Sequence, residues 1–167
     1  MLASTTSLTH TVTVDAWLSR VLGPSRGQGS SAEVVALFCK AGEVLWQRAV
    51  STLGTVTLTA IANRALYTAA SRYPFLATLY AQPNGQARWG SATMERLARV
   101  PRVVLLDGLR FTLIDLLAMV GRLTAEILSE DLHATLLDVE VAATLESSGS
   151  SAPMPFAMAQ TTDEVLS

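Results

Sequence analysis

Apolar positions recur at helical spacing through most of the chain, and the longest such stretch covers residues 102–128. There a broad apolar stripe repeats every three or four residues, as on the buried face of an amphipathic helix: Leu105, Leu109, Leu113, Leu116, Leu117, Val120, Leu123 and Ile127. Charged residues such as Asp107 and Arg122 interrupt each apolar run before the ~18 uncharged residues that a membrane span requires. We therefore expect a core helix that ends near Ser129.

The other face of this predicted helix also carries apolar residues. Val104, Phe111 and Ala118 recur at seven-residue spacing among the charges, and Ile114 lies beside them. A large aromatic residue on a charged face indicates a second contact, which is either another helix of the same chain or a seam between molecules. These four residues are the candidate interface, and both alternatives remain open.

Two more helices are expected between residues 30 and 73. In the first, Ser30 precedes Glu33 by three residues, which is the spacing of a capping box, and Gly54 is a typical C-terminal stop. Its apolar face is expected at Val34, Leu37, Phe38, Ala41, Val44, Leu45, Ala49 and Leu53. The second begins with β-branched residues, but Ile61, Ala65 and Ala69 keep helical spacing up to the stop at Pro74.

The remaining segments predict two further helices and a small hairpin. A short helix is expected at 91–100, and another at 129–146 has Ser129 as its N-cap and an apolar face at Leu132, Leu136, Val139 and Ala143. Alternating Leu76, Thr78 and Tyr80, followed by an Asn-Gly turn, allow one small β-hairpin near residues 75–90. The prediction is a mainly α protein, a compact bundle of five or six helices.

The chain divides by composition into four parts around one domain. Residues 1–22 are expected to form an N-terminal arm with a short helix, and the Gly- and Ser-rich residues 23–31 a flexible loop. Residues 32–146 form the predicted bundle, and 147–167 a linker and C-terminal tail. In the tail, Met154, Phe156 and Met158 are a candidate docking motif, with disorder as the alternative.

The composition is unusually apolar for a small monomer. Half of the residues are hydrophobic and 16% are charged, against about 25% charged in an average soluble protein. Some apolar surface is therefore expected to be covered by another copy of the chain or by a protein partner. The single cysteine, Cys39, and the lack of a secretory signal pattern favour a cytoplasmic location.

The charges are separated along the chain. Residues 1–122 hold all twelve Lys and Arg with six acids, and residues 123–167 hold the other eight acids. The acidic end is expected to lie against the basic region of its own chain or of a neighbour, unless both are simply solvated. Four arginines form a candidate charge patch: Arg88, Arg96, Arg99 and Arg102. Nucleic acid is nevertheless disfavoured as a partner, because the chain is acidic overall and has one lysine.

The sequence contains no recognisable catalytic, metal or nucleotide motif. His10 and His133 are the two imidazoles, and nothing in the sequence places either beside a nucleophile. Glu130 and His133 have the Glu-x-x-His spacing of di-iron bundles, but those sites need the motif twice. A symmetric dimer could supply the second copy, with Glu126 one turn earlier as another ligand. Acidic residues that stabilise a helix start explain the same residues. We therefore expect no metal, no cofactor and no enzymatic activity.

The expected function is that of a non-enzymatic helical interaction protein, namely an adaptor, a regulatory subunit or a structural subunit. It is expected to self-associate or to dock on a protein partner through apolar helix faces. The alternative is a regulatory domain that binds a small hydrophobic ligand inside the bundle. In that case the aromatic walls are expected at Trp46, Tyr67, Tyr73 and Trp89.

Overall fold

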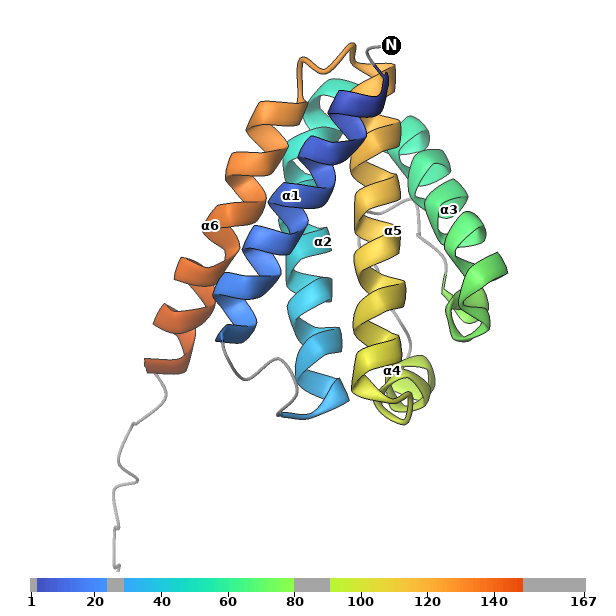
Figure 1. Ribbon diagram of the computed structural model, residues 1–167, viewed down its shortest axis with the longest axis vertical. Coiled ribbons are helices and arrows are strands. Elements are labelled where there is room, and N and C mark those ends of the chain that lie inside the picture. Colours follow the sequence, from blue (N-terminus) through green and yellow to red (C-terminus); the bar gives the residue numbers. More distant parts are fainter. Residues whose placement is uncertain (1–2, 24–28, 80–90, 149–167) are drawn as a thin grey trace, which may run out of the picture.

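The computed structural model describes residues 3–23, 29–79 and 91–148, and its regular elements there are all helices (Figure 1). They are α1 (Ala3–Leu22), α2 (Ser31–Leu53), α3 (Thr55–Arg72), the 3₁₀ helix η2 (Pro74–Thr78), α4 (Ser91–Ala98), α5 (Arg102–Leu123) and α6 (Ser129–Ser148). The predicted mainly α bundle is therefore confirmed. Within these residues no helix has both the length and the apolarity to cross a membrane.

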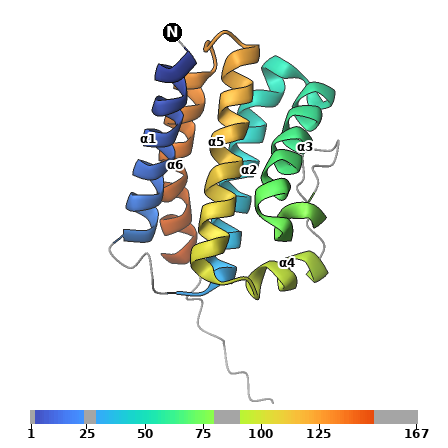
Figure 2. The same cartoon turned by 45° about the vertical axis from the view of Figure 1, so that its right-hand side comes forward.

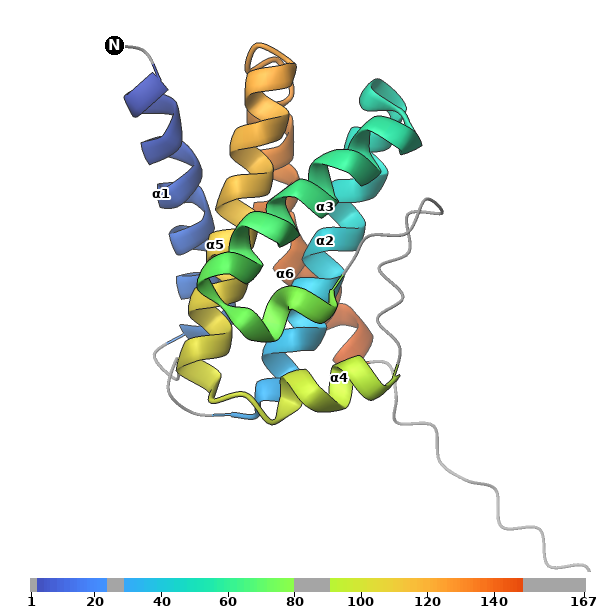
Figure 3. The ribbon, with the colours of Figure 1, turned by 90° about the vertical axis from the view of Figure 1, so that its right-hand side faces the viewer.

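Helix α5 lies between α1 and α3, and α2 and α6 complete the bundle behind it (Figures 2 and 3). The short helix α4 crosses one end of the bundle. At the opposite end, the start of α1, the α2–α3 connection and the α5–α6 turn lie at a similar level (Figure 1). This second end of the bundle holds the candidate site described below.

Helix α1 is longer than the sequence predicted, and it is part of the bundle. Val14 and Trp17 are fully buried, and the Trp17 ring meets Phe38 of α2 edge to face, with 5.3 Å between ring centroids. Asp15 of α1 also accepts two hydrogen bonds from the Arg110 guanidinium of α5, at 2.6 and 2.7 Å. The first helix therefore packs against α5 and α6, whereas the sequence predicted a separate arm.

Local signals predicted the ends of α2 correctly. The N–H of Glu33 donates to the Ser30 hydroxyl at 3.2 Å, and the N–H of Ser30 donates to the Glu33 carboxylate at 3.1 Å. Gly54, with φ of +74°, ends α2 and leads into α3. The members of the predicted face that are buried in α2 are Val34, Phe38, Ala41, Leu45 and Ala49.

The second face of α5 is partly covered by the end of α3 and by Tyr73, which follows it. The Phe111 ring lies 6.0 Å from that of Tyr73, and the Arg72 guanidinium lies 5.7 Å from its centroid. Ile114 is also half-buried against the core, whereas Val104 remains 44% exposed. For Phe111 and Ile114, the second contact that the sequence indicated lies within the chain.

The segment after α3 is helical where the hairpin was expected to begin. Residues Pro74–Thr78 form η2 and bury Leu76, and Phe75 lies close to α5 at Gly108. A Cβ at Gly108 would lie 2.6 Å from the Phe75 ring, so the missing side chain permits this close packing. Residues 80–90 of the predicted hairpin lie outside the described residues, as do 24–28 of the loop and 149–167 of the tail with Met154, Phe156 and Met158.

The apolar stripe of α5 ends earlier than predicted. Five of its residues are buried as expected: Leu105, Leu109, Leu113, Leu117 and Val120. The prediction was wrong for Leu123 and Ile127, which are 63% and 80% exposed. The helix ends at Leu123, and the chain turns before α6 begins at Ser129. Beyond that turn the helical register no longer directs side chains into the core.

Candidate functional site

The α5–α6 turn holds two residues in left-handed backbone conformations. Ala125 and Glu126 have φ of 48° and 65°, and the N–H of Glu126 donates to the carbonyl of Gly121 at 2.8 Å. This six-to-one hydrogen bond is typical of a Schellman motif, in which glycine usually occupies the position of Ala125. A left-handed non-glycine residue costs about 1–2 kcal/mol. Such strain occurs often at functional positions.

The turn places the Glu126 carboxylate beside Ser129 and Gly121. The Ser129 hydroxyl donates to Oε2 of Glu126. A Cβ at Gly121 would lie 2.6 Å from that oxygen and 2.9 Å from the Ser129 hydroxyl oxygen. Glycine at position 121 therefore provides the space in which the carboxylate and the hydroxyl meet.

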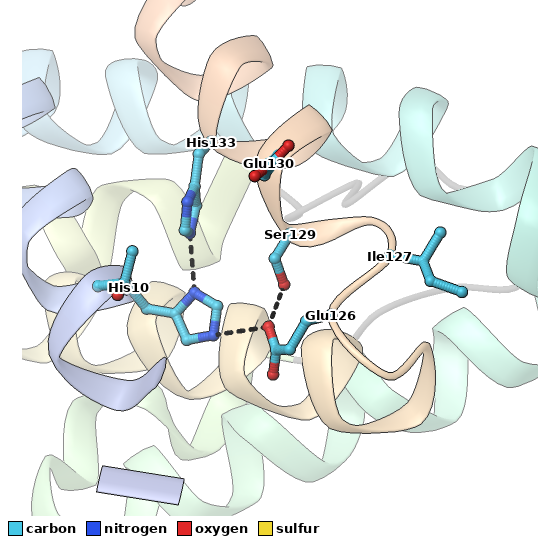
Figure 4. A pocket seen from close by; sticks show the side chains of 7 residues that line it. His10, Glu126, Ile127, Ser129, Glu130 and His133 are labelled. Carbon is cyan, nitrogen blue, oxygen red and sulfur yellow. Dashed lines mark hydrogen bonds and ion pairs between the residues drawn. The ribbon is translucent and has the colours of Figure 1, made fainter. Parts of the chain in front are cut away.

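Two histidines, one from the first and one from the last of the described helices, meet next to this carboxylate (Figure 4). His10 of α1 is 1% exposed, and its Nδ1 lies 2.8 Å from Nε2 of His133 on α6. Its other nitrogen, Nε2, points toward Oε2 of Glu126 at 3.8 Å, which exceeds hydrogen-bond distance. This buried Nε2 therefore has no hydrogen-bond partner.

The residues around the two histidines line a pocket of about 390 Å³, which we call the corner pocket. Its lining residues are Thr9, His10, Glu126, Ile127, Ser129, Glu130 and His133. Ile127 and Glu130 are exposed, so the pocket opens at the surface, where α1 meets the α5–α6 turn. It combines a buried imidazole, two carboxylates and one exposed apolar side chain.

Burial keeps both imidazoles neutral at neutral pH. Desolvation lowers the pKa of His10; the Glu126 carboxylate partly offsets this effect and Arg122 adds to it. Desolvation also lowers the pKa of His133, with a further contribution from His10, while Glu126 and Glu130 oppose the shift. The corner pocket is therefore lined by two neutral imidazoles and by the acidic side chains of Glu126 and Glu130.

The contacts in the corner pocket fit binding better than covalent chemistry. The Ser129 hydroxyl donates to a carboxylate and not to an imidazole, so no base is positioned to activate it. Across the described ranges, no three His, Cys, Asp or Glu side chains gather in a way that could hold a metal ion. The Cys39 thiol is half-buried, and burial, with a smaller effect of Glu43, raises its pKa to about 11.

The three described arginines of the predicted charge patch differ in exposure. Arg96 and Arg99 are exposed at α4 and just after it. Arg102 instead donates to the carbonyl of Ser30 at 2.8 Å and is 11% exposed, while Arg88 lies outside the described residues. In the acidic C-terminal region, the Asp131 carboxylate of α6 forms an ion pair with the Arg48 guanidinium of α2, at 2.5 Å.

Sequence reasoning did not bring His10 and His133 together. The pair is separated by 123 positions, and no local pattern encodes such a contact. One available signal was that His10 lies four and seven residues before the buried Val14 and Trp17, and so shares their helix face. A histidine on such a face needs a polar partner inside the protein.

No family model, curated protein or solved structure matches this chain. The corner pocket is therefore interpreted from its own geometry.

Gly121→Ala should disturb the corner pocket, whereas Gly42→Ala should be harmless. The added methyl at 121 must displace the Glu126 carboxylate and the Ser129 hydroxyl, and we expect a loss of about 1 kcal/mol in the free energy of unfolding. A Cβ at Gly42, within α2, meets nothing within 4 Å and should add up to about 1 kcal/mol of stability. Urea denaturation of both variants measures the difference, and equal effects would contradict the proposed role of Gly121.

Proposed function

We propose that this chain is a non-enzymatic interaction protein that docks on a protein partner at the corner pocket. The observation that carries the proposal is that one pocket is lined both by a buried imidazole nitrogen without a hydrogen-bond partner and by an exposed apolar side chain. His10 supplies the nitrogen, and Ile127 supplies the apolar side chain, which is 80% exposed. Protein interfaces typically combine an apolar anchor with a few specific polar contacts.

The position of Ile127 supports a protein partner over a small ligand. The corner pocket opens at the surface, and Leu123, which is 63% exposed, ends α5 four residues before Ile127 in the sequence. A small ligand in such an open pocket would remain partly solvated, whereas a protein surface would cover both apolar side chains. The strained turn also holds Glu126 at a defined position before any partner arrives.

The alternative of a small hydrophobic ligand has less support from the side-chain positions. Tyr67 is 79% exposed on α3, while Trp46 and Tyr73 are packed against the core. Trp89 lies outside the described residues. The corner pocket itself is lined mainly by polar and charged side chains, which an apolar ligand would leave unpaired.

A photo-crosslinking amino acid at Ile127 tests the docking site, with Tyr67 as a control of nearly equal exposure. In cells we expect one discrete adduct from position 127 and none from position 67. An adduct of twice the chain mass identifies a second copy as the partner; any other mass identifies a different protein. No adduct, or the same adduct from both positions, contradicts the proposal.

The partner should then be purified and its affinity measured. Ile127→Glu should weaken binding at least about tenfold, because loss of an interface anchor costs 1–2 kcal/mol or more. Tyr67→Glu should leave the affinity unchanged. Equal affinities for the two variants would show that the adduct arose from proximity and not from docking.

A further inference from the structure

We infer that the corner pocket accepts a protonated amine or guanidinium, supplied by a lysine or arginine side chain of the docking partner. This inference rests on the proposed function, because it names the chemistry of the partner at the same site. Its starting point is His10 Nε2, which is buried, lacks a hydrogen-bond partner and faces the Glu126 carboxylate. A cationic N–H group satisfies both atoms at once.

The geometry between the two atoms suits a single donor group. When His10 donates its Nδ1–H to His133, its Nε2 carries a lone pair that faces Oε2 of Glu126 across 3.8 Å. Two acceptors at that separation do not bond to each other. A nitrogen placed about 2.9 Å from each forms two normal hydrogen bonds. An ammonium or guanidinium carries enough N–H groups to make both.

The surrounding charge selects a cation over an anion or a neutral group. Glu126 and Glu130 both line the corner pocket, and the two imidazoles are neutral. A bound carboxylate or phosphate would be repelled by these acids, whereas a cation forms charge-assisted hydrogen bonds with them. Arg122 lies nearby, but its guanidinium is exposed and donates to the carbonyl of Ala118 along α5.

The test uses three short peptides that are identical except for a central lysine, norleucine or glutamate between two leucines. The chain has two histidines, so the nitrogen-15 signals of His10 and His133 report on the pocket without overlap. We expect the lysine peptide to bind about tenfold or more tightly than the norleucine peptide, and the glutamate peptide not to bind. Binding should shift the signal of His10 Nε2, which the free protein should show as unprotonated.

Variants of single carboxylates provide the matched controls. Glu126→Gln keeps the shape of the side chain and removes its charge. It should therefore lower the affinity for the lysine peptide at least about tenfold. Glu130→Gln, at the exposed edge of the pocket, should weaken it less. Glu95→Gln, at an exposed position of α4, should have no effect. Circular dichroism confirms that each variant remains helical.

Each outcome separates this inference from the proposed function. Equal binding of the lysine and norleucine peptides, or full binding to Glu126→Gln, overturns the cation inference. If the Ile127 crosslink persists in that case, the docking proposal stands and only the partner chemistry is wrong. If the lysine peptide binds but no crosslink forms, the docking proposal fails. A shift of both histidine signals by zinc, with displacement of the peptide, would mark a metal site and overturn the inference.

Discussion

Lowering the pH from about 7.5 to about 5 should reduce the free energy of unfolding by up to about 1.4 kcal/mol per pH unit for each of the two histidines. Burial lowers the pKa of His10 and of His133 below the usual value of 6.5. Below pH 6.5 the unfolded chain therefore binds protons that the folded chain does not. The contribution of the two neutral histidines to the free energy of unfolding is fully present above pH 6.5. It is lost as the pH falls toward their lower pKa in the folded state.

The groups around the histidines set the size of this effect. Glu126 and Glu130 favour protonation in the folded state and reduce the loss, while Arg122 increases it at His10. Asp115 acts in the opposite direction, because burial raises its pKa and acid therefore favours its folded form. Urea denaturation at a series of pH values measures the profile. The double variant His10→Gln, His133→Gln should no longer lose stability in this way below pH 6.5. An unchanged profile would show that the two histidines do not cause the loss.

Trp17→Ala should lower the free energy of unfolding by about 3–5 kcal/mol, a large part of the 5–15 kcal/mol typical of a domain. The side chain is 0% exposed and contacts Phe38 edge to face, so its removal leaves a cavity between α1 and α2. Its buried Nε1 has no hydrogen-bond partner, which places the expected loss nearer the lower value. Thermal and urea denaturation measure the change.

Val12→Ala is the matched control on the same helix. Val12 is 64% exposed, and its truncation should change stability by no more than about 0.5 kcal/mol. If Trp17→Ala had an equally small effect, α1 would contribute little to the bundle, as expected for the N-terminal arm that the sequence alone predicted. A large difference between the two variants supports α1 as an integral part of the bundle.

The sequence predicted elements with local signals and missed features that depend on tertiary packing. Ser30, Glu33 and Gly54 define the ends of α2 by hydrogen bonds between near neighbours, so their pattern was sufficient. The end of α5 was harder to place, because Ala125 occupies a position where glycine usually signals the stop. Ile127 was therefore assigned to the core, although it is 80% exposed and lines the corner pocket.

The candidate site could not be assembled from sequence for the same reason. His10 and Glu126 come together because α1 packs beside the α5–α6 turn, and helical periodicity contains no information on which helices are neighbours. Likewise, the apolar second face of α5 indicated a contact but not its partner. The structure shows that Phe111 packs against Tyr73 of the same chain.

The contact between the first and last described helices has a consequence for biosynthesis. His133 is synthesised 123 residues after His10. At a synthesis rate of about 5–20 residues per second, this interval is roughly 6–25 s. During that time α1 lacks α6, one of the helices against which it packs, so the core around Trp17 is incomplete. Nascent chains at this stage are therefore expected to depend on chaperones, and their native packing to be completed only after α6 has left the ribosome.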